Sequence, residues 1–416
     1  MTDLFDKLSA NKGPLSRSSD RFQAEGYFFF PKLGGVISNR MTFKGNEMII
    51  WSINNYLGLA NHPEVREADA KAAEEWGLAY PMGARMLTGN TAYHEQLEKE
   101  LSEFVHKEDT ILLNYGYQGM VSSIHSLLNR RDVVIYDSDA HGCIVDGVHL
   151  HAGKRFVYPH NNIEKLEKQL QRAEQLVKDT DGAILVITEG VFGMAGDQGC
   201  LKEIVALKKR YQFRFFVDDA HGFGTVGQTG AGAGEEQGVQ DEIDIYFSTF
   251  AKSMASIGAF ISSDKCVIDN LRYNNRSQML AKSLPLPIVI GNLKRLELLR
   301  NCPELREKLW DNVRALQSGL RARGFNLGRT DSPVTPVFMN CTMEETWSLT
   351  VDLRETYKIF CSVIIYPVVP KDVLMLRMIP TAVHTKEDIE ETLDAFSVVQ
   401  EKLKAGEYAK EELVKV

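Results

Sequence analysis

The segment FRFFVDDAHGFG, residues 213–224, decides the fold class of this chain. It opens with an apolar, aromatic-rich run that is typical of a buried strand, and it closes with two acids, a histidine and glycines suited to a turn. In open α/β sheets, binding and catalytic residues collect just beyond the carboxyl ends of such strands. The segment therefore predicts a strand that delivers Asp218 and His221 to a candidate site.

Further strand-like runs lie on both sides of this segment, with amphipathic stretches between them. The strand-like runs are residues 110–116, 133–138, 155–160, 184–190 and 245–251, and the two clearest helical patterns are residues 92–107 and 163–179. Buried strands that alternate with helices indicate an α/β domain with a largely parallel sheet.

The pattern changes after the segment SLPLP, residues 283–287. Two long helical patterns come first, and they are followed by strand-like runs at residues 332–340, 360–366 and 374–379 and by a closing helix that begins near Lys386. This order predicts a smaller α+β domain. We expect an N-terminal arm over residues 1–50 that belongs partly to the small domain, a large domain over residues 51–290 and the small domain over residues 291–416.

Composition and charge narrow the classes of function. The chain has 416 residues, six dispersed cysteines and a formal net charge of −8. An acidic balance disfavours nucleic acid or an anionic membrane as the main partner. The cysteines form no CxxC pair and no ligand-like spacing with histidine, which disfavours disulfides and a metal site. No apolar run approaches the roughly 18–20 residues of a membrane span, and the N-terminus lacks a signal-peptide core, so we expect a soluble, cytoplasmic protein.

Polar residues stand at or just after the ends of the strand-like runs. Gly116 and Tyr117 open a helix, where free backbone N–H groups suit a phosphate. His141, Glu189 and Lys252 stand at the ends of other runs. Any one of them alone is typical of a salt bridge or a surface side chain. Together they predict one catalytic crevice at the edge of the sheet.

Gly222, Gly224 and Gly227 satisfy the GxGxxG pattern of dinucleotide-binding sites. Such a site needs its first glycine at the end of the strand and a helix directly afterwards. Here DDAH stands between the strand and the first glycine, and residues 228–238 are a poor helix. We therefore interpret the segment as a turn-rich loop, and an NAD(P)-dependent dehydrogenase is kept as a distant alternative.

The ordered motifs resemble those of the α-oxoamine synthase family of fold-type I pyridoxal-phosphate enzymes. The resemblance runs from about Asp20 to about Leu403 and rests on the motifs NNYLGLANHP (54–63), GARMLTGNT (83–91), DAHGCIVDG (139–147), VFGMAGD (191–197), VDDAHGFGTVG (217–227), STFAKS (248–253) and LRMIPTAVHT (376–385). It implies an α/β chain of fold type I, in which a large domain with a mostly parallel seven-stranded sheet precedes a smaller α+β domain. It also implies pyridoxal 5′-phosphate as the cofactor.

The resemblance assigns roles to individual residues. Lys252 resembles the lysine that holds the cofactor as a Schiff base and can move the α-proton. Asp218 resembles the carboxylate that faces the pyridinium nitrogen and keeps the ring an electron sink. His221 resembles the partner of the phenolic oxygen, and His141 resembles the histidine that stacks on the ring. The cofactor-binding residues implied in this way are Gly116, Tyr117, His141, Glu189, Asp218, His221, Thr249, Lys252, Lys282 and Ser283.

Further residues are assigned to the substrates and to a second subunit. Arg377 resembles the arginine that grips the substrate carboxylate, where a planar guanidinium gives a bidentate contact. Asn54 resembles a residue near that carboxylate, and Arg85 lies in the motif GARMLTGNT, which we assign to the substrate as well. Lys282 and Ser283 stand where relatives reach the phosphate of a second subunit, which implies a homodimer with shared active sites.

Two departures from the family pattern concern the site. Relatives often carry the motif VFSMDGD, whereas this chain has Gly193 and Ala195 in place of the serine and the first aspartate. A hydroxyl near the cofactor is therefore missing or replaced. Relatives often have a hydroxyl or amide pair before Ser-Leu-Pro, whereas this chain has Ala281 and Lys282.

The resemblance implies an acyltransferase that condenses an amino acid with an acyl thioester and releases carbon dioxide. The motifs at residues 83–91 and 250–260 are similar to those of bacterial serine palmitoyltransferases. We therefore expect L-serine and a palmitoyl thioester, giving 3-ketosphinganine in the first step of sphingolipid synthesis. The alternatives are cysteate, as in sulfonolipid synthesis, and glycine, as in glycine C-acetyltransferase. The acyl carrier is coenzyme A or acyl carrier protein, and at most a peripheral membrane contact is expected.

Overall fold

The computed structural model describes residues 2–10 and 26–409, and these form two compact units. One unit spans Asn54–Lys308, and the other combines Met1–Ile53 with Leu309–Val416. The chain therefore leaves the N-terminal unit near Ile53 and returns to it within the first turns of helix α13 (Pro303–Ala322). Within the described residues, no helix is both long enough and apolar enough to cross a membrane.

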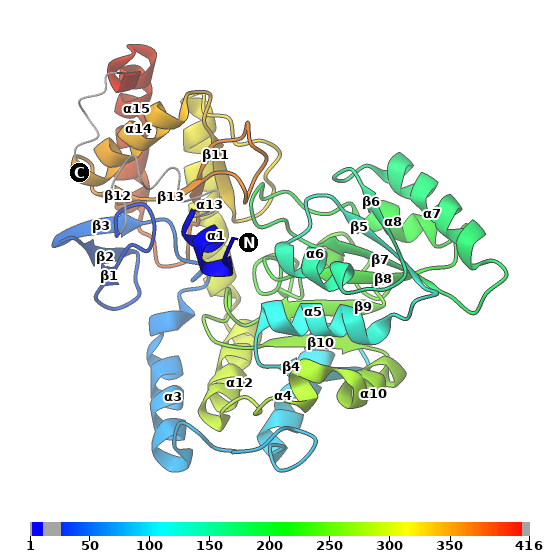
Figure 1. Ribbon diagram of the computed structural model, residues 1–416. Coiled ribbons are helices and arrows are strands. Elements are labelled where there is room, and N and C mark those ends of the chain that lie inside the picture. The colour runs from blue at the N-terminus through cyan, green and yellow to red at the C-terminus, as the bar shows by residue number, and fades with distance from the viewer. Residues whose placement is uncertain (1, 11–25, 410–416) are drawn as a thin grey trace. The chain divides into compact units, whose positions relative to one another are not determined.

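The unit Asn54–Lys308 is built on a seven-stranded sheet with the order β4-β10-β9-β8-β7-β5-β6 (Figure 1). The strands are β4 (Asp109–Leu113), β5 (Val133–Asp137), β6 (Lys154–Tyr158), β7 (Ile184–Glu189), β8 (Arg214–Asp218), β9 (Ile245–Thr249) and β10 (Ala259–Ser263). Strands β5 to β9 run parallel to one another. Strand β10 pairs antiparallel with both β4 and β9. The expected mostly parallel sheet is confirmed, and β10 is an addition that the sequence pattern did not reveal.

Apolar residues hold helices against the sheet. Strands β5, β7 and β9 are buried along their whole length, as expected for strands covered on both faces. Helix α5 (Gly116–Leu127) buries Met120 and Ile124, and helix α6 (Gly142–His149) buries Ile144 and Val148 in the same core as Val134 and Phe216. Both helices lie on the near side of the sheet in Figure 1.

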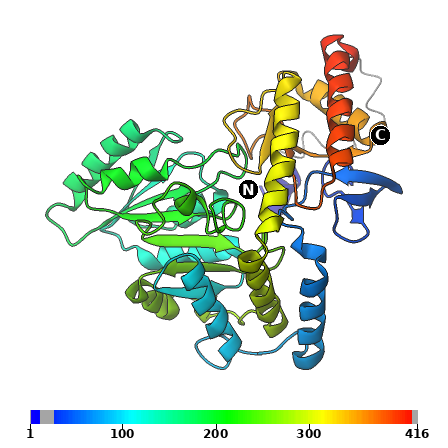
Figure 2. The ribbon, with the colours of Figure 1, turned by 180° about the vertical axis from the view of Figure 1, so that it is seen from behind.

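Helices also support the edge of this sheet at β4. Helix α3 (Pro63–Trp76) packs on helix α12 (Leu286–Asn301), and α12 packs in turn on helix α4 (Ala92–Phe104). Figure 2 shows these three helices beside one another from behind. A partly buried bidentate ion pair joins α12 to α3, because the guanidinium of Arg295 donates to both carboxylate oxygens of Asp69 at 2.8 Å.

The second unit contains two small sheets. One has the order β1-β2-β3-β12, with β1 (Leu33–Gly34), β2 (Arg40–Phe43), β3 (Asn46–Ile50) and β12 (Ile359–Phe360). The other has the order β11-β14-β13, with β11 (Thr335–Phe338), β14 (Met375–Met378) and β13 (Ser362–Ile364). The expected smaller α+β unit is confirmed, and it includes the N-terminal strands.

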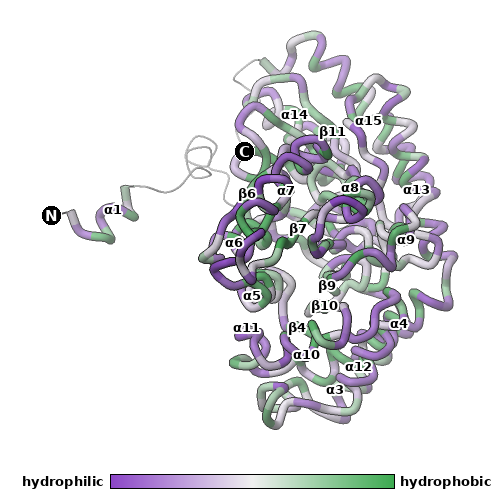
Figure 3. Tube along the Cα trace, turned by 90° about the vertical axis from the view of Figure 1, so that its right-hand side faces the viewer, coloured by the Kyte–Doolittle hydropathy of each residue, from purple (hydrophilic) through white to green (hydrophobic). Residues whose placement is uncertain are grey.

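The helices of this unit are amphipathic. Helix α13 buries Leu309, Val313, Leu316 and Leu320, which recur every three or four residues, and the rest of its surface is mostly hydrophilic (Figure 3). Helix α15 (Lys386–Lys404) begins at the expected position. Its N-terminus is a capping box in which Thr385 and Asp388 bind each other's backbone N–H groups. Helix α14 (Met343–Glu355) completes the unit.

Candidate functional site

Asp218 ends strand β8 and is buried, with only 3% of its surface exposed. Within the described part of the chain its hydrogen-bond donors are the N–H of Ala220, at 3.1 Å, and the thiol of Cys143, at 3.9 Å. Burial raises the pKa of Asp218, and the positive charge of Lys252 opposes that rise, as does His141 when it is protonated. Asp218, Lys252 and His141 therefore lie within electrostatic reach of one another, and their catalytic roles stay predictions.

His141 reaches this cluster from the end of strand β5. Its side chain caps helix α6 by accepting the N–H of Cys143 at 3.2 Å, and its own backbone N–H donates to the carboxylate of Glu189 at 2.6 Å. Burial lowers the pKa of His141, so its ring is held in the neutral form at neutral pH. A neutral, capped imidazole is suited to stacking on a planar ring.

Glu189 lies beside Asp218 because the two residues are in register at the ends of neighbouring strands. Burial raises the pKa of Glu189 well above its usual range, and the negative charge of Asp218 raises it further. Two buried carboxyl groups at adjacent strand ends repel each other when both are ionised, which raises the free energy of the site. A nearby cation lowers that free energy. Lys252, which follows strand β9, supplies such a charge to both.

His221 is fixed by two neighbours that the sequence analysis did not assign. The hydroxyl of Tyr56 is hydrogen-bonded to Nδ1 of His221 at 2.8 Å, within the buried interior. On the other side of the ring, a β-carbon added at Gly193 would lie 2.3 Å from Nε2 of His221. The imidazole therefore occupies the space that a side chain at residue 193 would need. The glycine that this chain has in place of the family's serine therefore leaves the space that the ring of His221 fills.

The start of helix α5 lies against strand β9, as a phosphate site requires. A β-carbon added at Gly116 would lie 3.2 Å from Oγ1 of Thr249, so the two residues are in close contact. The helix begins after Tyr115 without a side-chain cap, which leaves its first N–H groups for an anion. Tyr117, in the first turn, contacts His141 edge to face with 6.0 Å between ring centroids. Its hydroxyl also donates to the carboxylate of Asp146.

The GxGxxG segment is a turn-rich loop, as expected, and its first glycine, Gly222, lies against the buried carboxylate of Asp219. Asp219 accepts the N–H of Ala233 at 2.8 Å and the hydroxyl of Tyr246 at 3.0 Å. β-Carbons added at Gly190, Gly222 or Gly232 would lie 1.8–2.1 Å from its carboxylate oxygens. Gly190, Gly222 and Gly232 therefore leave the space that Asp219 occupies, and burial raises the pKa of this carboxyl to about 7.

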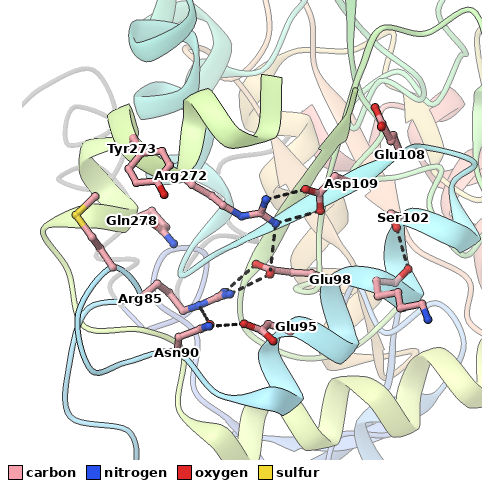
Figure 4. Close-up of a pocket in the computed structure, with 12 residues that line it drawn as sticks. Arg85, Asn90, Glu95, Glu98, Ser102, Glu108, Asp109, Arg272, Tyr273 and Gln278 are labelled. Atoms are coloured by element: carbon pink, nitrogen blue, oxygen red, sulfur yellow. Dashed lines mark hydrogen bonds and ion pairs between the residues drawn. The ribbon is translucent and has the colours of Figure 1, made fainter. Parts of the chain in front are cut away.

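Arg85 is one of the residues that line a pocket beside helix α4 (Figure 4). Its guanidinium donates to both carboxylate oxygens of Glu98, at 2.8 and 2.9 Å, and to Asn90 at 2.7 Å. Arg272 approaches the same Glu98 and is paired with Asp109 in turn. This ion-pair network ties the segment around Arg85 to helix α4 and strand β4. The assignment of Arg85 to the substrate stays a prediction.

Four further predicted residues remain: Asn54, Lys282 and Ser283 belong to the same unit as Lys252, and Arg377 belongs to the other. Asn54 has a buried side-chain oxygen without a hydrogen-bond partner among the described residues. The same holds for the hydroxyl of Ser283, whose backbone N–H donates to Gly83 at 2.9 Å, and the carbonyl of Lys282 accepts from Asn114. Arg377 lies on strand β14 of the other unit and is 7% exposed. Their roles stay predictions.

Comparisons with known proteins agree with this fold. The family model described as aminotransferase class I and II matches residues 46–396. A cysteate-C-fatty acyltransferase of Capnocytophaga ochracea is 60% identical over 408 residues, which cover 98% of this chain and 97% of that protein. A serine palmitoyltransferase of Sphingobacterium spiritivorum is 33% identical, covering 92% of this chain and 96% of that protein. The solved structure of Sphingomonas wittichii serine palmitoyltransferase has a TM-score of 0.90 and 30% identity, covering 97% of this chain and 100% of that one.

The chain therefore belongs to the class I and II aminotransferase family, whose members of fold type I use pyridoxal 5′-phosphate. Within that family it is a pyridoxal-phosphate-dependent acyltransferase of the α-oxoamine synthase kind. The site residues fit the cofactor on their own chemistry. Asp218 is a buried carboxylate with few donors, which a protonated ring nitrogen would complete. The uncapped start of helix α5 beside Thr249 suits the phosphate.

The contact between Gly193 and His221 gives a testable prediction. A serine or alanine at residue 193 would place its β-carbon against Nε2 of His221, so the ring must move and its hydrogen bond to Tyr56 is lost. We expect Gly193→Ser to lower kcat by about a hundred-fold, the scale for a misplaced group in an active site. Steady-state kinetics of the purified holoenzyme measure this.

The matched control is Gly34→Ser. A β-carbon added at Gly34 meets nothing nearer than 3.8 Å, so this variant should keep wild-type activity and stability. A Gly193→Ser enzyme with wild-type kcat would contradict the assigned place of His221.

Proposed function

We propose that the protein condenses L-cysteate with a long-chain acyl thioester to give a sulfonated amino ketone. The observation that carries this proposal is the 60% identity, over nearly the full length of both chains, to a cysteate-C-fatty acyltransferase. Proteins described as serine palmitoyltransferases match at 33–34%. The support therefore moves from serine, which the motifs favoured, to cysteate, which was an alternative.

The reaction balances without an external oxidant or reductant. The α-carbon of the amino acid first loses its proton and then forms a bond to the acyl carbonyl carbon. The bond from that carbonyl to sulfur breaks, and the sulfur leaves as a thiolate that takes up a proton. The carboxylate then leaves as carbon dioxide, and a proton takes its place on the α-carbon. The bound cofactor supplies the electron-withdrawing ring that stabilises negative charge at the α-carbon.

The residues of the chain supply binding, orientation and proton transfer. We propose that Lys252 binds the cofactor and moves the α-proton, with Asp218 keeping the ring nitrogen protonated. His141 covers the ring, and His221 binds the phenolic oxygen from a position set by Tyr56 and Gly193. Arg377 and Asn54 bind the substrate carboxylate in the proposal. The unpartnered side-chain oxygen of Asn54 is consistent with a role in a ligand-binding site.

The charge of the loop at residues 191–198 also favours an anionic side chain on the substrate. The loop approaches His221 through Gly193, and its one acid, Asp197, is paired with His160 at 2.8 Å. Ala195 stands where relatives often carry an aspartate. The loop therefore presents no unpaired negative charge to repel a sulfonate, whose attraction or repulsion is strong where water is excluded.

We propose a homodimer as the working state, with Lys282 and Ser283 of one subunit close to the phosphate of the other. Met86 and Tyr273 line the pocket that contains Arg85, and several large apolar side chains at residues 78–87 and 273–280 are exposed. Leu78, Met82, Leu87, Tyr273 and Leu280 are 77%, 76%, 80%, 68% and 75% exposed. Exposed apolar residues in this number are typical of a surface that another protein covers.

The substrate proposal is tested by one matrix of assays. Cysteate, aspartate, serine, alanine and glycine are each combined with acetyl, decanoyl and palmitoyl thioesters, and thiol release and product mass are measured. We expect cysteate with palmitoyl thioester to have the highest kcat/KM. Efficiency should rise with chain length, because each methylene buried contributes about 0.8 kcal/mol. Serine with palmitoyl thioester as the best pair would contradict the cysteate proposal, and glycine with acetyl thioester would contradict the long-chain donor as well.

Arg377 provides a separate test of carboxylate binding. We expect Arg377→Ala to weaken the binding of every amino acid by about 2–4 kcal/mol, because a charged partner is left unpaired. Arg377→Lys should restore only part of that loss, since lysine lacks the planar fork. The change in cofactor absorbance on titration with each amino acid measures the affinity. An Arg377→Ala enzyme with unchanged affinity for cysteate and alanine alike would remove Arg377 from the site.

A further inference from the structure

His160, just after strand β6, binds a carboxylate through each of its ring nitrogens. Nδ1 lies 3.0 Å from a carboxylate oxygen of Asp137, and Nε2 lies 2.8 Å from one of Asp197. The ring of Phe192 packs edge to face against the imidazole, with 4.4 Å between centroids. No assigned role in the reaction accounts for this arrangement, which lies outside the Lys252 cluster.

The first carboxylate, that of Asp137, is connected to His141 by a short segment of the chain. Asp137 ends strand β5 and is fully buried, and it also accepts the backbone N–H groups of Asp139 and Asn161 at 2.9 Å. The chain then needs only Ser138 to Ala140 to reach His141. The turn that delivers His141 to the site is therefore fixed at its origin by Asp137, and Asp137 is held by His160.

The second carboxylate, that of Asp197, belongs to the same loop as Gly193. Asp197 closes the loop that follows strand β7, because the N–H of Phe192 donates to the carbonyl of Asp197 at 2.9 Å. Val191 and Gln198 pair as an isolated bridge across the base of the same loop. Phe192, which packs on His160, directly precedes Gly193, whose backbone lies against the ring of His221. The position of this loop thus sets the space available to His221.

We propose that His160 is a positioning residue for the cofactor site: its doubly bound imidazolium ties the turn that carries His141 to the loop that carries Gly193. The proposal rests on the cofactor site of the proposed function, but it is independent of which amino acid the enzyme uses. His160 itself touches neither reacting group and acts through Asp137, Asp197 and Phe192.

Electrostatics support a charged ring at this place. Burial disfavours the charge of His160, but the hydrogen bonds and negative charges of Asp137 and Asp197 outweigh it and raise the pKa to about 10. The titratable groups near His160 and its carboxylate partners are Asp137, Asp139, Asp197, Tyr158 and Cys200. One potential ligand atom from each of Asp137, Asp139 and His160 lies within 4.8 Å of the other two, which is close enough for a metal ion. A ring with a carboxylate at each nitrogen favours the doubly protonated form over a metal ligand.

The test compares His160→Gln with His125→Gln. Glutamine cannot bind both carboxylates as a cation, whereas His125 is an exposed residue of helix α5 whose replacement should change nothing. We expect His160→Gln to weaken the binding of pyridoxal 5′-phosphate to the apoenzyme by about ten-fold or more and to shift the visible band of the holoenzyme. We also expect kcat to fall by a larger factor than KM for the acyl thioester changes. Equilibrium dialysis, absorbance and kinetics measure these effects.

A second variant keeps the proposal falsifiable if His160→Gln does not fold. Asp197→Asn preserves the shape of the loop but removes one of the two charges on His160. It should show the same spectral shift and weakened cofactor binding. Combining it with His160→Gln should add little, because both changes break one contact. A metal chelator should leave the wild-type cofactor affinity unchanged, and a loss of affinity on chelation would favour a metal site and overturn the proposal.

The pH dependence of stability supplies a further readout. The folded pKa of His160 is raised from 6.5 to about 10, so its contribution to stability is fully present below pH 6.5 and is lost as the pH rises toward 10. The difference in melting temperature between the wild type and His160→Gln should therefore shrink across that range. A variant that melts earlier but keeps wild-type cofactor affinity, spectrum and kcat would show a purely structural role and overturn the proposal.

Discussion

The carboxylate of Asp218 is buried at the end of strand β8 with few hydrogen-bond donors, and the surrounding site depends on how its charge is balanced. Removing a carboxylate from water costs several kcal/mol unless a cation or good hydrogen bonds replace the water. In this chain the positive charge of Lys252 supplies part of that balance. In the proposed function, the protonated ring nitrogen of the cofactor would supply the rest of the balance.

The parallel sheet makes this balance possible because it gathers strand ends at one edge. Strands β5, β7, β8 and β9 end near His141, Glu189, Asp218 and Lys252, and adjacent strands place these groups side by side. Loops from the same edge then refine the positions. The loop through Gly193 limits the space of His221, and the glycines around Asp219 allow the following loop to close on a buried carboxyl. Rigid strands thus set the cluster, and close-packed loops set its details.

The sequence predicted what depends on local pattern. Buried apolar runs that end in polar residues identified the parallel strands, and the strand-end position of Asp218 and Lys252 identified the cluster. Strand β10 was missed because it follows strand β9 after the segment FAKSMASIG with no helix between them, so the alternation of strands and helices did not mark it. The partners of His221 were missed because Tyr56 and Gly193 are far from it in sequence and meet it only through packing. Arg85 was assigned to the substrate from a motif, whereas its pairing with Glu98 depends on the tertiary placement of helix α4.

The central claim is that Lys252, beside the buried Asp218, carries the cofactor. Borohydride reduction of the holoenzyme, followed by peptide mapping with mass spectrometry, tests it most directly, because reduction fixes the cofactor on the lysine that holds it. We predict a single modified peptide with the added mass on Lys252, and no labelled peptide from Lys252→Ala. Modification of a different lysine in the wild type, or undiminished labelling of the Lys252→Ala variant, would contradict the claim.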